Sequence, residues 1–479
     1  MADDLNSLLE KVNNKLTDSA LFYFANDPER EIGLELLLKN FHLLHIDASQ
    51  YLPLFDVKKI KYFCLEETLG KYNSVFRSSL KLITHDLTRK YLVANGKKTN
   101  YAQTFKISPA FEHKARELQF KPVNPASHLN RTFENKISQF NELQNLNISK
   151  PEAIIITLKD AVFEELTTKF GVRFVVQFDR GHTGSGTFFI ENEPELNRLK
   201  LTFPERSVKI SEFVEGNAYT LNACITSKGV FLGGLSYQIT GTPGVANSPS
   251  ATIGNDFSYR PDIDAQMLSK IISEMTVLGE FMKNKGFRGL FGIDLIVNRD
   301  GFKLIEINAR QSASVPMFTK MQLLEDQVPL ALLHLAEFLE ADFELETPSY
   351  NEFNLAPKNY SQVFLRTAVN MTVAAQIEMG IYRLQSDNTA INRDTGEVRP
   401  NTIFLDEAQD KPLIFYSNTY SIEDLTKQAG FIILAPIKGR VLKAGAELAR
   451  LQLAQSAIAD GKLAPWIIET LTALRSYQS

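Results

Sequence analysis

Three polar residues, Glu306, Asn308 and Arg310, alternate with apolar ones at the end of a predicted hairpin. In a β-strand, residues two apart point to the same face, so a carboxylate, an amide and a guanidinium would stand in one row. A three-residue loop ending at Gly301 would set Asp294, on the preceding strand, opposite Glu306, whereas a two-residue loop would send the two acids to opposite faces. Carboxylate and amide oxygens suit Mg²⁺, and a guanidinium suits a phosphate or carboxylate. The first register predicts a metal site beside an anion site.

The neighbours of these polar residues are apolar, which predicts that the hairpin is buried. Apolar positions occupy both predicted strands: Phe291, Ile293, Leu295, Val297, Ile305 and Ile307. Buried polar groups need partners or ligands, so exposure to solvent by chance explains the whole set poorly. For Asp294 alone, a solvated hairpin edge is the simpler interpretation.

A glycine-rich loop follows the strand predicted at 174–177. Glycine backbones can turn successive N–H groups inward as an anion nest, and such a loop on a mobile lobe can cover nucleotide phosphates. A plain connection between two strands is the alternative interpretation, and no Gly-Lys-Ser/Thr sequence ends the loop as in a Walker motif. The loop residues with predicted phosphate contacts are His182, Thr183, Gly184, Ser185 and Gly186.

The elements that would position these motifs are those of a mixed α/β protein. No GxGxxG follows the first predicted strand, so we expect the N-terminal part to be structural or to face the substrate. Strands are predicted at 20–24, 61–65, 154–156, 174–177 and 208–214. Helices are predicted at about 32–38, 133–146, 160–169, 264–285 and 446–459.

The 479 residues carry 52 Lys and Arg against 56 Asp and Glu, a formal net charge of −4. This balance gives no electrostatic reason to expect a nucleic-acid or membrane partner. Cys64 and Cys224 have neither the spacing of a disulfide framework nor that of a metal site. The acidic N-terminus is unlike a signal peptide, and no apolar run approaches the roughly 20 residues of a membrane span. These features predict a cytoplasmic protein.

Asp294 followed by Glu306-x-Asn308-x-Arg310 resembles the metal-binding hairpin of the ATP-grasp superfamily. The resemblance implies an α/β (α+β) fold, in which a two-lobe nucleotide clamp is preceded by an α/β domain and followed by a β-rich cap with terminal helices. The expected parts are an N-terminal pre-ATP-grasp-like domain at 1–125, the ATP-grasp domain at 126–345 with its small lobe at about 150–215, and the cap at 346–479.

The resemblance also implies roles for individual residues. Asp294, Glu306 and Asn308 would bind the Mg²⁺ (or Mn²⁺) that accompanies ATP. Arg310 and Arg288 would hold the substrate carboxylate or the acyl phosphate made from it. The other expected ATP contacts are the glycine-loop residues, Lys136 in the entry helix, and a linker that reads the adenine edge, formed by Glu212, Phe213, Val214 and Glu215.

The chain departs from the superfamily pattern at two positions. Gln177 stands where a second phosphate-binding lysine is usual, and a glutamine supplies no charge. Arg180 is the nearest cation in sequence that could replace it at the nucleotide, and His182 is a second candidate. Ala218 stands where an acid commonly holds the ribose hydroxyls, and Glu215 could substitute only if the turn is rearranged.

The implied activity is ATP-dependent ligation of a carboxylate to an amine through an acyl phosphate, with release of ADP and phosphate. The expected substrates are small-molecule or peptide carboxylates and amines, and the oligomeric state, including a homo-oligomer, stays open. A catalytically decayed nucleotide-binding regulatory protein is one alternative, motivated by Gln177 and Ala218. An ATP-grasp carboxylase or thiol ligase is another, although neither a biotin-carrier lysine nor a coenzyme A motif is evident.

Overall fold

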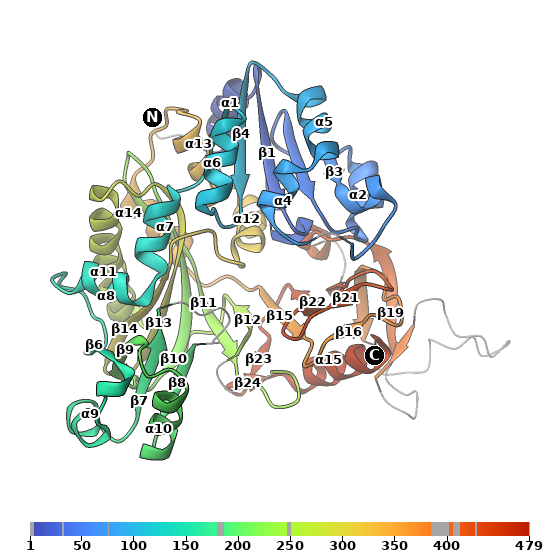
Figure 1. The fold of residues 1–479 in the computed structure, drawn as a ribbon. Helices are drawn as coiled ribbons and strands as arrows, with labels where there is room; N and C mark the ends of the chain where they lie inside the picture. Colours follow the sequence, from blue (N-terminus) through green and yellow to red (C-terminus); the bar gives the residue numbers. More distant parts are fainter. Residues whose placement is uncertain are drawn as a thin grey trace.

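The computed structural model contains three connected regions that follow one another along the chain (Figure 1). An α/β unit formed by the N-terminal residues lies above the other two in that view. The region with the predicted hairpin and the β-rich C-terminal part lie side by side below it. The structure describes residues 4–30, 33–74, 76–179, 186–246, 251–384, 402–405, 412–426 and 429–478.

The N-terminal unit is built on a parallel sheet with the strand order β3-β2-β1-β4-β5. All residues of β1 are buried, as expected for a central strand whose sheet is covered by helices on both faces. The strands predicted at 20–24 and 61–65 are confirmed as β1 and β3. The elements are β1 (Ser19–Ala25), β2 (Phe41–His45), β3 (Tyr62–Cys64), β4 (Thr99–Thr104), β5 (Phe120–Pro122), α1 (Leu5–Lys15), α2 (Tyr51–Lys58), α3 (Leu65–Leu69), α4 (Ser79–Thr84), α5 (Asp86–Asn95) and α6 (Pro109–Glu117).

The helix predicted around 32–38 is wrong over the described residues 33–38, which form turns. The Leu37 N–H donates to the Leu34 carbonyl over 2.9 Å, an isolated turn rather than a helical ladder. Leu34 and Leu38 are buried, so their spacing reflects burial of two side chains and not a helix.

The small lobe, residues 153–212, is a four-stranded antiparallel sheet in the order β6-β9-β7-β8. Val176, Val208 and Ile210 of this sheet pack with Leu166 and Leu196 of two helices. The helices therefore cover one face, and the alternate residues of the strands point to the other face. The elements are β6 (Ala153–Thr157), β7 (Phe174–Phe178), β8 (Thr187–Ile190), β9 (Ser207–Glu212), α9 (Phe163–Phe170) and α10 (Glu193–Thr202).

A second, much larger sheet runs from the predicted hairpin into the C-terminal part. Within the described residues its order is β14-β13-β10-β11-β12-β15-β22-β20-β17-β19-β18. The antiparallel pair β12 and β15 carries the sheet across the boundary expected near residue 345. The division of the chain at 125 and 345 stays a prediction. The strands are β10 (Asn217–Ile225), β11 (Val230–Thr240), β12 (Thr252–Asp256), β13 (Gly289–Asn298), β14 (Gly301–Asn308), β15 (Ser361–Arg366), β17 (Gly380–Leu384), β18 (Ile403–Phe404), β19 (Pro412–Asn418), β20 (Phe431–Leu434) and β22 (Glu447–Leu453).

Asn135 divides the helix predicted at 133–146 into two. Its side-chain oxygen accepts hydrogen bonds from the backbone N–H groups of Ile137 (3.0 Å) and Ser138 (3.1 Å), and so caps a helix that begins at Lys136. Along the described stretches, no helix is both long and apolar enough to cross a membrane. The remaining helices are α7 (Ser127–Glu134), α8 (Lys136–Leu143), α11 (Ala265–Asn284), α12 (Val315–Leu324), α13 (Leu330–Phe338), α14 (Thr347–Leu355) and α15 (Pro465–Gln478).

The helix predicted at 446–459 is wrong, because its first half forms β22 between β15 and β20. Its Ala, Leu, Gln and Glu residues favour a helix locally. The backbone of β22 pairs with β15 on one side and with β20 on the other, however. Six of the seven residues of β22 are buried. Tertiary context therefore overrides local propensity. Only α15 forms a helix in the described residues after 446.

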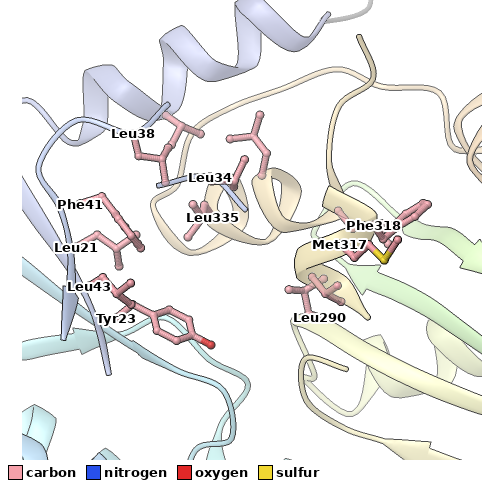
Figure 2. Close-up of a cluster of buried hydrophobic side chains, with 14 of the residues drawn as sticks. Leu21, Tyr23, Leu34, Leu38, Phe41, Leu43, Leu290, Met317, Phe318 and Leu335 are labelled. Atoms are coloured by element: carbon pink, nitrogen blue, oxygen red, sulfur yellow. The ribbon is translucent and has the colours of Figure 1, made fainter. Parts of the chain in front are cut away.

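Buried apolar side chains join the N-terminal unit to the next region (Figure 2). Leu21 and Leu43, from β1 and β2, belong to the same cluster as Leu335 of α13 and Leu290 of β13. The Tyr23 hydroxyl also donates to the side chain of Gln311 over 3.4 Å, just after β14. This packing fixes the carboxyl ends of the parallel strands next to the hairpin.

Candidate active site

The predicted hairpin forms, and it brings Asp294 directly opposite Glu306. The prediction about its loop is wrong, because β13 and β14 are joined by only two residues, 299–300. In that register Asp294 would face Ile305. A bulge after Leu304 adds one residue to β14 and moves Glu306 into register instead. The two acids therefore share one face although the loop alone would separate them.

Three side chains hold the Asp294 carboxylate in place. Its Oδ1 accepts hydrogen bonds from Thr220 (2.9 Å) and Gln238 (2.8 Å), and its Oδ2 accepts one from Asn308 Nδ2 (3.0 Å). Burial raises the pKa of Asp294 to about 6, and the negative charge of Glu306 acts in the same direction. A carboxylate pair held together in this way is a place where a cation would be stabilised.

Two cations flank the acid pair. Lys136 Nζ, at the start of α8, lies 2.5 Å from Glu306 Oε1, and the Lys136 side chain is only 8% exposed. Arg310 donates from Nη2 to Asn308 Oδ1 over 3.1 Å, and its Nε lies 3.1 Å from Glu134 Oε1. Five of the predicted site residues are thus brought together around one hairpin: Lys136, Asp294, Glu306, Asn308 and Arg310.

Arg288 is not part of this group. Its guanidinium lies 3.3 Å from Glu337 of α13, and it donates to the backbone carbonyls of Lys283 and Phe287. Arg288 precedes Asp294 by six residues, and at about 3.3 Å per strand residue the two are roughly 20 Å apart along the chain. The contacts of Arg288 are those of a residue that anchors the start of β13.

The linker expected at the adenine edge is attached to both lobes. Glu212 accepts a hydrogen bond from the Glu152 N–H over 3.0 Å, within the small lobe. Asn298, at the tip of the hairpin, donates to the Glu215 carbonyl over 2.7 Å. The Arg173 guanidinium lies 3.9 Å from the ring centroid of Phe213. The linker therefore fixes the small lobe relative to β13 and β14.

Gln177 lies in the small lobe next to the predicted glycine loop. It is 6% exposed, and its Nε2 lies 3.4 Å from Thr187 Oγ1 across the β7 and β8 pair. Gly186 is described, and its carbonyl accepts a hydrogen bond from the Phe178 N–H over 2.8 Å. The remaining loop residues with predicted nucleotide contacts, Arg180, His182, Thr183, Gly184 and Ser185, lie outside the described residues.

A cavity of about 520 Å³ lies at the carboxyl ends of β1, β2 and β4. Its walls come from residues 24–30, 47–51 and 104–106 of the N-terminal unit and from 434–449 of the C-terminal part. The chain runs from β1 to β2 on one side and returns to place β4 on the other, which makes this a switch point of a parallel sheet, where ligands typically bind. The volume suits a small molecule.

Phe105 connects this cavity with the acid pair. Its ring centroid lies 4.9 Å from the guanidinium carbon of Arg30 and 5.1 Å from that of Arg310. The adjacent Lys106 forms an ion pair with Glu134, which also pairs with Arg310. A molecule in the cavity would therefore have one end beside Arg310.

Two arginines of the cavity wall, Arg30 and Arg366, form no ion pair within the part of the chain that the structure describes. Arg366 donates to the Gly445 carbonyl over 3.2 Å. The other wall arginines, Arg77 and Arg440, are paired with acids at 2.6 Å and 2.7 Å. Glu447 acts electrostatically on both guanidinium groups but forms an ion pair with neither, so both can bind a further anion.

Glu29 is the most perturbed acid of the cavity wall. It lies 3.1 Å from Arg450. Burial raises the pKa of Glu29 to about 8 and the charge of Glu447 adds to this, whereas Arg450 lowers it.

Residues 133–314, which contain the hairpin, the small lobe and both flanking cations, match the family model described as an ATP-grasp domain. The chain contains an ATP-grasp domain. A comparison with curated proteins by sequence gives no match.

Solved structures with a similar fold extend the comparison beyond the ATP-grasp domain. One is a carboxyaminoimidazole ribonucleotide synthase from Aspergillus clavatus in complex with ATP, with a TM-score of 0.53, 13% identity, and coverage of 96% of this chain and 100% of that one. Another is the biotin carboxylase domain of the Hydrogenobacter thermophilus 2-oxoglutarate carboxylase with MgADP and bicarbonate, with a TM-score of 0.56, 10% identity, and coverage of 91% and 86%. A third is biotin carboxylase from Campylobacter jejuni, with a TM-score of 0.54, 11% identity, and coverage of 91% and 87%. These similarities confirm the predicted fold class, with an α/β domain before the ATP-grasp domain and a β-rich part after it.

The hairpin of the ATP-grasp domain fits a divalent cation. Asp294 and Glu306 present two hard carboxylates on one face, and burial together with the Glu306 charge raises the pKa of Asp294. The Asn308 oxygen accepts one hydrogen bond from Arg310, and its second lone pair could bind a metal. Among the described residues no three Asp, Glu, His or Cys side chains cluster, so the other ligands would be Asn308 and oxygens of a bound phosphate.

Several residues near the ATP-grasp site escaped the sequence analysis. Thr220 and Gln238 lie on β10 and β11 in ordinary alternating strands, with no signal beyond that pattern. Phe105 and Arg366 come from the flanking regions and reach the site only through the fold. Lys209 is the register partner of Gln177. A count of cations on each predicted small-lobe strand would have pointed to Lys209.

Proposed function

We propose that the protein is an ATP-dependent ligase that joins a carboxylate to an amine through an acyl phosphate, releasing ADP and phosphate. The observation that carries the proposal is the position of the Asp294 and Glu306 pair. Lys136 lies against it from α8, and Arg310 lies beyond it next to the cavity. This arrangement is suited to phosphoryl transfer between a nucleotide in the clamp and a carboxylate in the cavity.

Each residue has a defined task in this reaction. A carboxylate oxygen of the substrate attacks the γ-phosphorus of ATP, and the bond from that phosphorus to the ADP oxygen breaks. Lys136 would hold phosphate oxygens, and Arg310 would hold the carboxylate and then the acyl phosphate through its two-donor edge. Mg²⁺ held by Asp294, Glu306 and Asn308 would neutralise the charge of the phosphates. The amine then attacks the carbonyl carbon, phosphate leaves, and the amine proton passes to solvent.

The cavity indicates the class of substrate. Arg30 lies beside Phe105 at the end nearest Arg310, and Arg366 projects from β15 in the C-terminal part. Both lack ion-pair partners among the described residues, which favours a substrate that carries at least one further anionic group. The volume of about 520 Å³ favours a small molecule over a folded partner.

Carboxylation is the second candidate function. It is favoured by the biotin carboxylase and carboxyaminoimidazole ribonucleotide synthase folds, which each cover more than 90% of this chain. Bicarbonate would then be the carboxylate that ATP activates. A decayed regulatory protein is less well supported, because Asp294, Glu306, Lys136 and Arg310 are all in place.

A screen for ADP and phosphate release tests the proposal. The protein is incubated with Mg²⁺ and ATP, with pools of anionic carboxylates and amines, and hydroxylamine is added to trap an acyl phosphate as a hydroxamate. Release of ADP that requires both a carboxylate and an amine is expected, and it should be lost in Glu306→Ala. Release that requires bicarbonate and no other carboxylate would favour carboxylation. AMP and pyrophosphate as products would rule out the acyl-phosphate route.

A further inference from the structure

A lysine stands directly beside Gln177 in the small-lobe sheet. Lys209 on β9 is the register partner of Gln177 on β7 and of Ile155 on β6, and Thr187 on β8 is the other partner of Gln177. Paired residues of antiparallel strands project to the same face. Val208, the neighbour of Lys209, packs under the helices of the lobe, so the row that contains Lys209 faces away from them. Lys209 lines a small cavity together with Leu304 and Ile305 of β14, so this face is turned toward the hairpin.

Lys209 is buried without a compensating partner. It is 8% exposed, and no hydrogen bond or ion pair reaches its Nζ from any residue that the structure describes. Burial lowers its pKa to about 8, the charge of Lys136 acts in the same direction, and Glu306 opposes both. Glu306 is the one described carboxylate that acts on the charge of Lys209, and it already forms an ion pair with Lys136. An anion bound in the clamp would compensate the positive charges of Lys136 and Lys209.

We infer that Lys209 supplies the phosphate-binding cation that the ATP-grasp pattern places at position 177, and that it does so from the neighbouring strand. The inference rests on the proposed nucleotide site. Directly paired side chains in antiparallel strands have Cβ atoms about 4.5–5.5 Å apart, a distance that the four methylenes of a lysine span. Gln177 then contributes a neutral donor beside the charge. Arg180, the replacement expected from sequence order, is not needed for this role.

Nucleotide binding without any carboxylate substrate tests this assignment. Calorimetry in Mg²⁺ compares ATP, ADP and adenosine on the wild type, Lys209→Gln and Lys159→Gln, a matched control on an exposed small-lobe lysine. Lys209→Gln should weaken ATP and ADP about 10- to 100-fold and leave adenosine unchanged, as expected for loss of a charge-assisted contact. Lys159→Gln should bind all three as the wild type does. The melting temperature of Lys209→Gln should not fall, because the side chain it replaces is a charge without a partner.

A charge exchange makes the test sharper. Gln177→Lys combined with Lys209→Gln returns a lysine to the usual strand and should regain most of the lost ATP affinity, and Lys209→Arg should retain it. A double variant no tighter than Lys209→Gln would overturn the equivalence of the two positions. Unchanged ATP affinity in Lys209→Gln, with a loss in Arg180→Ala instead, would overturn the inference and leave the ligase proposal standing. Failure of the wild type to bind ATP would overturn both.

Discussion

Replacing Asp294 with asparagine should stabilise the substrate-free protein while abolishing its ATP-dependent activity. Burial and the opposing Glu306 raise the pKa of Asp294 from 3.8 to about 6. Each pKa unit corresponds to 1.36 kcal/mol, so the ionised carboxylate lowers the stability by about 3 kcal/mol at most. Asn308 donates to Asp294 Oδ2 and would face the new amide, which reduces the expected gain to about 1–2 kcal/mol.

The stabilisation should appear only as the pH rises. Folded Asp294 keeps its proton up to about pH 6, whereas the unfolded chain releases it near 3.8, so the stability of the wild type falls as the pH rises through that window. Asparagine has no such loss. The melting temperature of Asp294→Asn relative to the wild type should therefore increase from pH 4 to pH 6 and stay constant above. For a cooperative unit of 150–250 residues, each kcal/mol corresponds to about 2–4 °C.

Thermal melting from pH 4 to 8 without nucleotide measures this difference. Asp300→Asn is the matched control, because Asp300 is exposed at the tip of the same hairpin. Added Mg²⁺ and ATP should raise the melting temperature of the wild type and not that of Asp294→Asn. Parallel melting profiles for both proteins at every pH, or full turnover by Asp294→Asn, would refute the account of the acid pair.

Arg366→Ala should raise the KM for the anionic substrate by about tenfold or more in steady-state kinetics, with little change in the KM for ATP, because Arg366 lines the cavity. A raised KM for ATP with an unchanged KM for the anionic substrate would instead mean that Arg366 serves the nucleotide. Arg288→Ala should keep kcat and lose at most about 1 kcal/mol in chemical denaturation, because its ion pair with Glu337 is partly exposed; loss of turnover would instead support the catalytic role implied by the sequence. Lys136→Met should weaken ATP binding at least tenfold by calorimetry, because it removes the cation beside Glu306, and unchanged affinity would argue against phosphates in the clamp.

The acid pair could be predicted because the alternation of Glu306, Asn308 and Arg310 is a local property of one strand. The loop could not be predicted from the same pattern. Its two residues alone would have placed Asp294 on the wrong face. The bulge at Ile305 corrects the register next to Leu304, whose N–H donates to the Ser149 carbonyl outside the sheet. The outcome was right although the expected cause was not.

The cavity and the replacement cation depend on which segments meet in space. Arg30, Phe105 and Arg366 come from three regions of the chain, and none carries a motif that links it to the hairpin. Lys209 sits between two apolar residues of an ordinary strand, and only the pairing with Gln177 distinguishes it. The helix predicted at 446–459 is wrong for the same reason. Local composition favours a helix there, but the strands that pair with β22 lie elsewhere in the sequence.

Transfer of oxygen from the substrate to phosphate tests the central claim most directly. A carboxylate substrate identified by the screen is labelled with ¹⁸O in its carboxyl group. The mass of the phosphate released in the presence of ATP and the amine is then measured by mass spectrometry. Phosphorylation of the carboxylate predicts ADP and a phosphate that carries one ¹⁸O, and no product from Glu306→Ala. Unlabelled phosphate, or label in AMP with pyrophosphate as the second product, would contradict phosphorylation of the carboxylate.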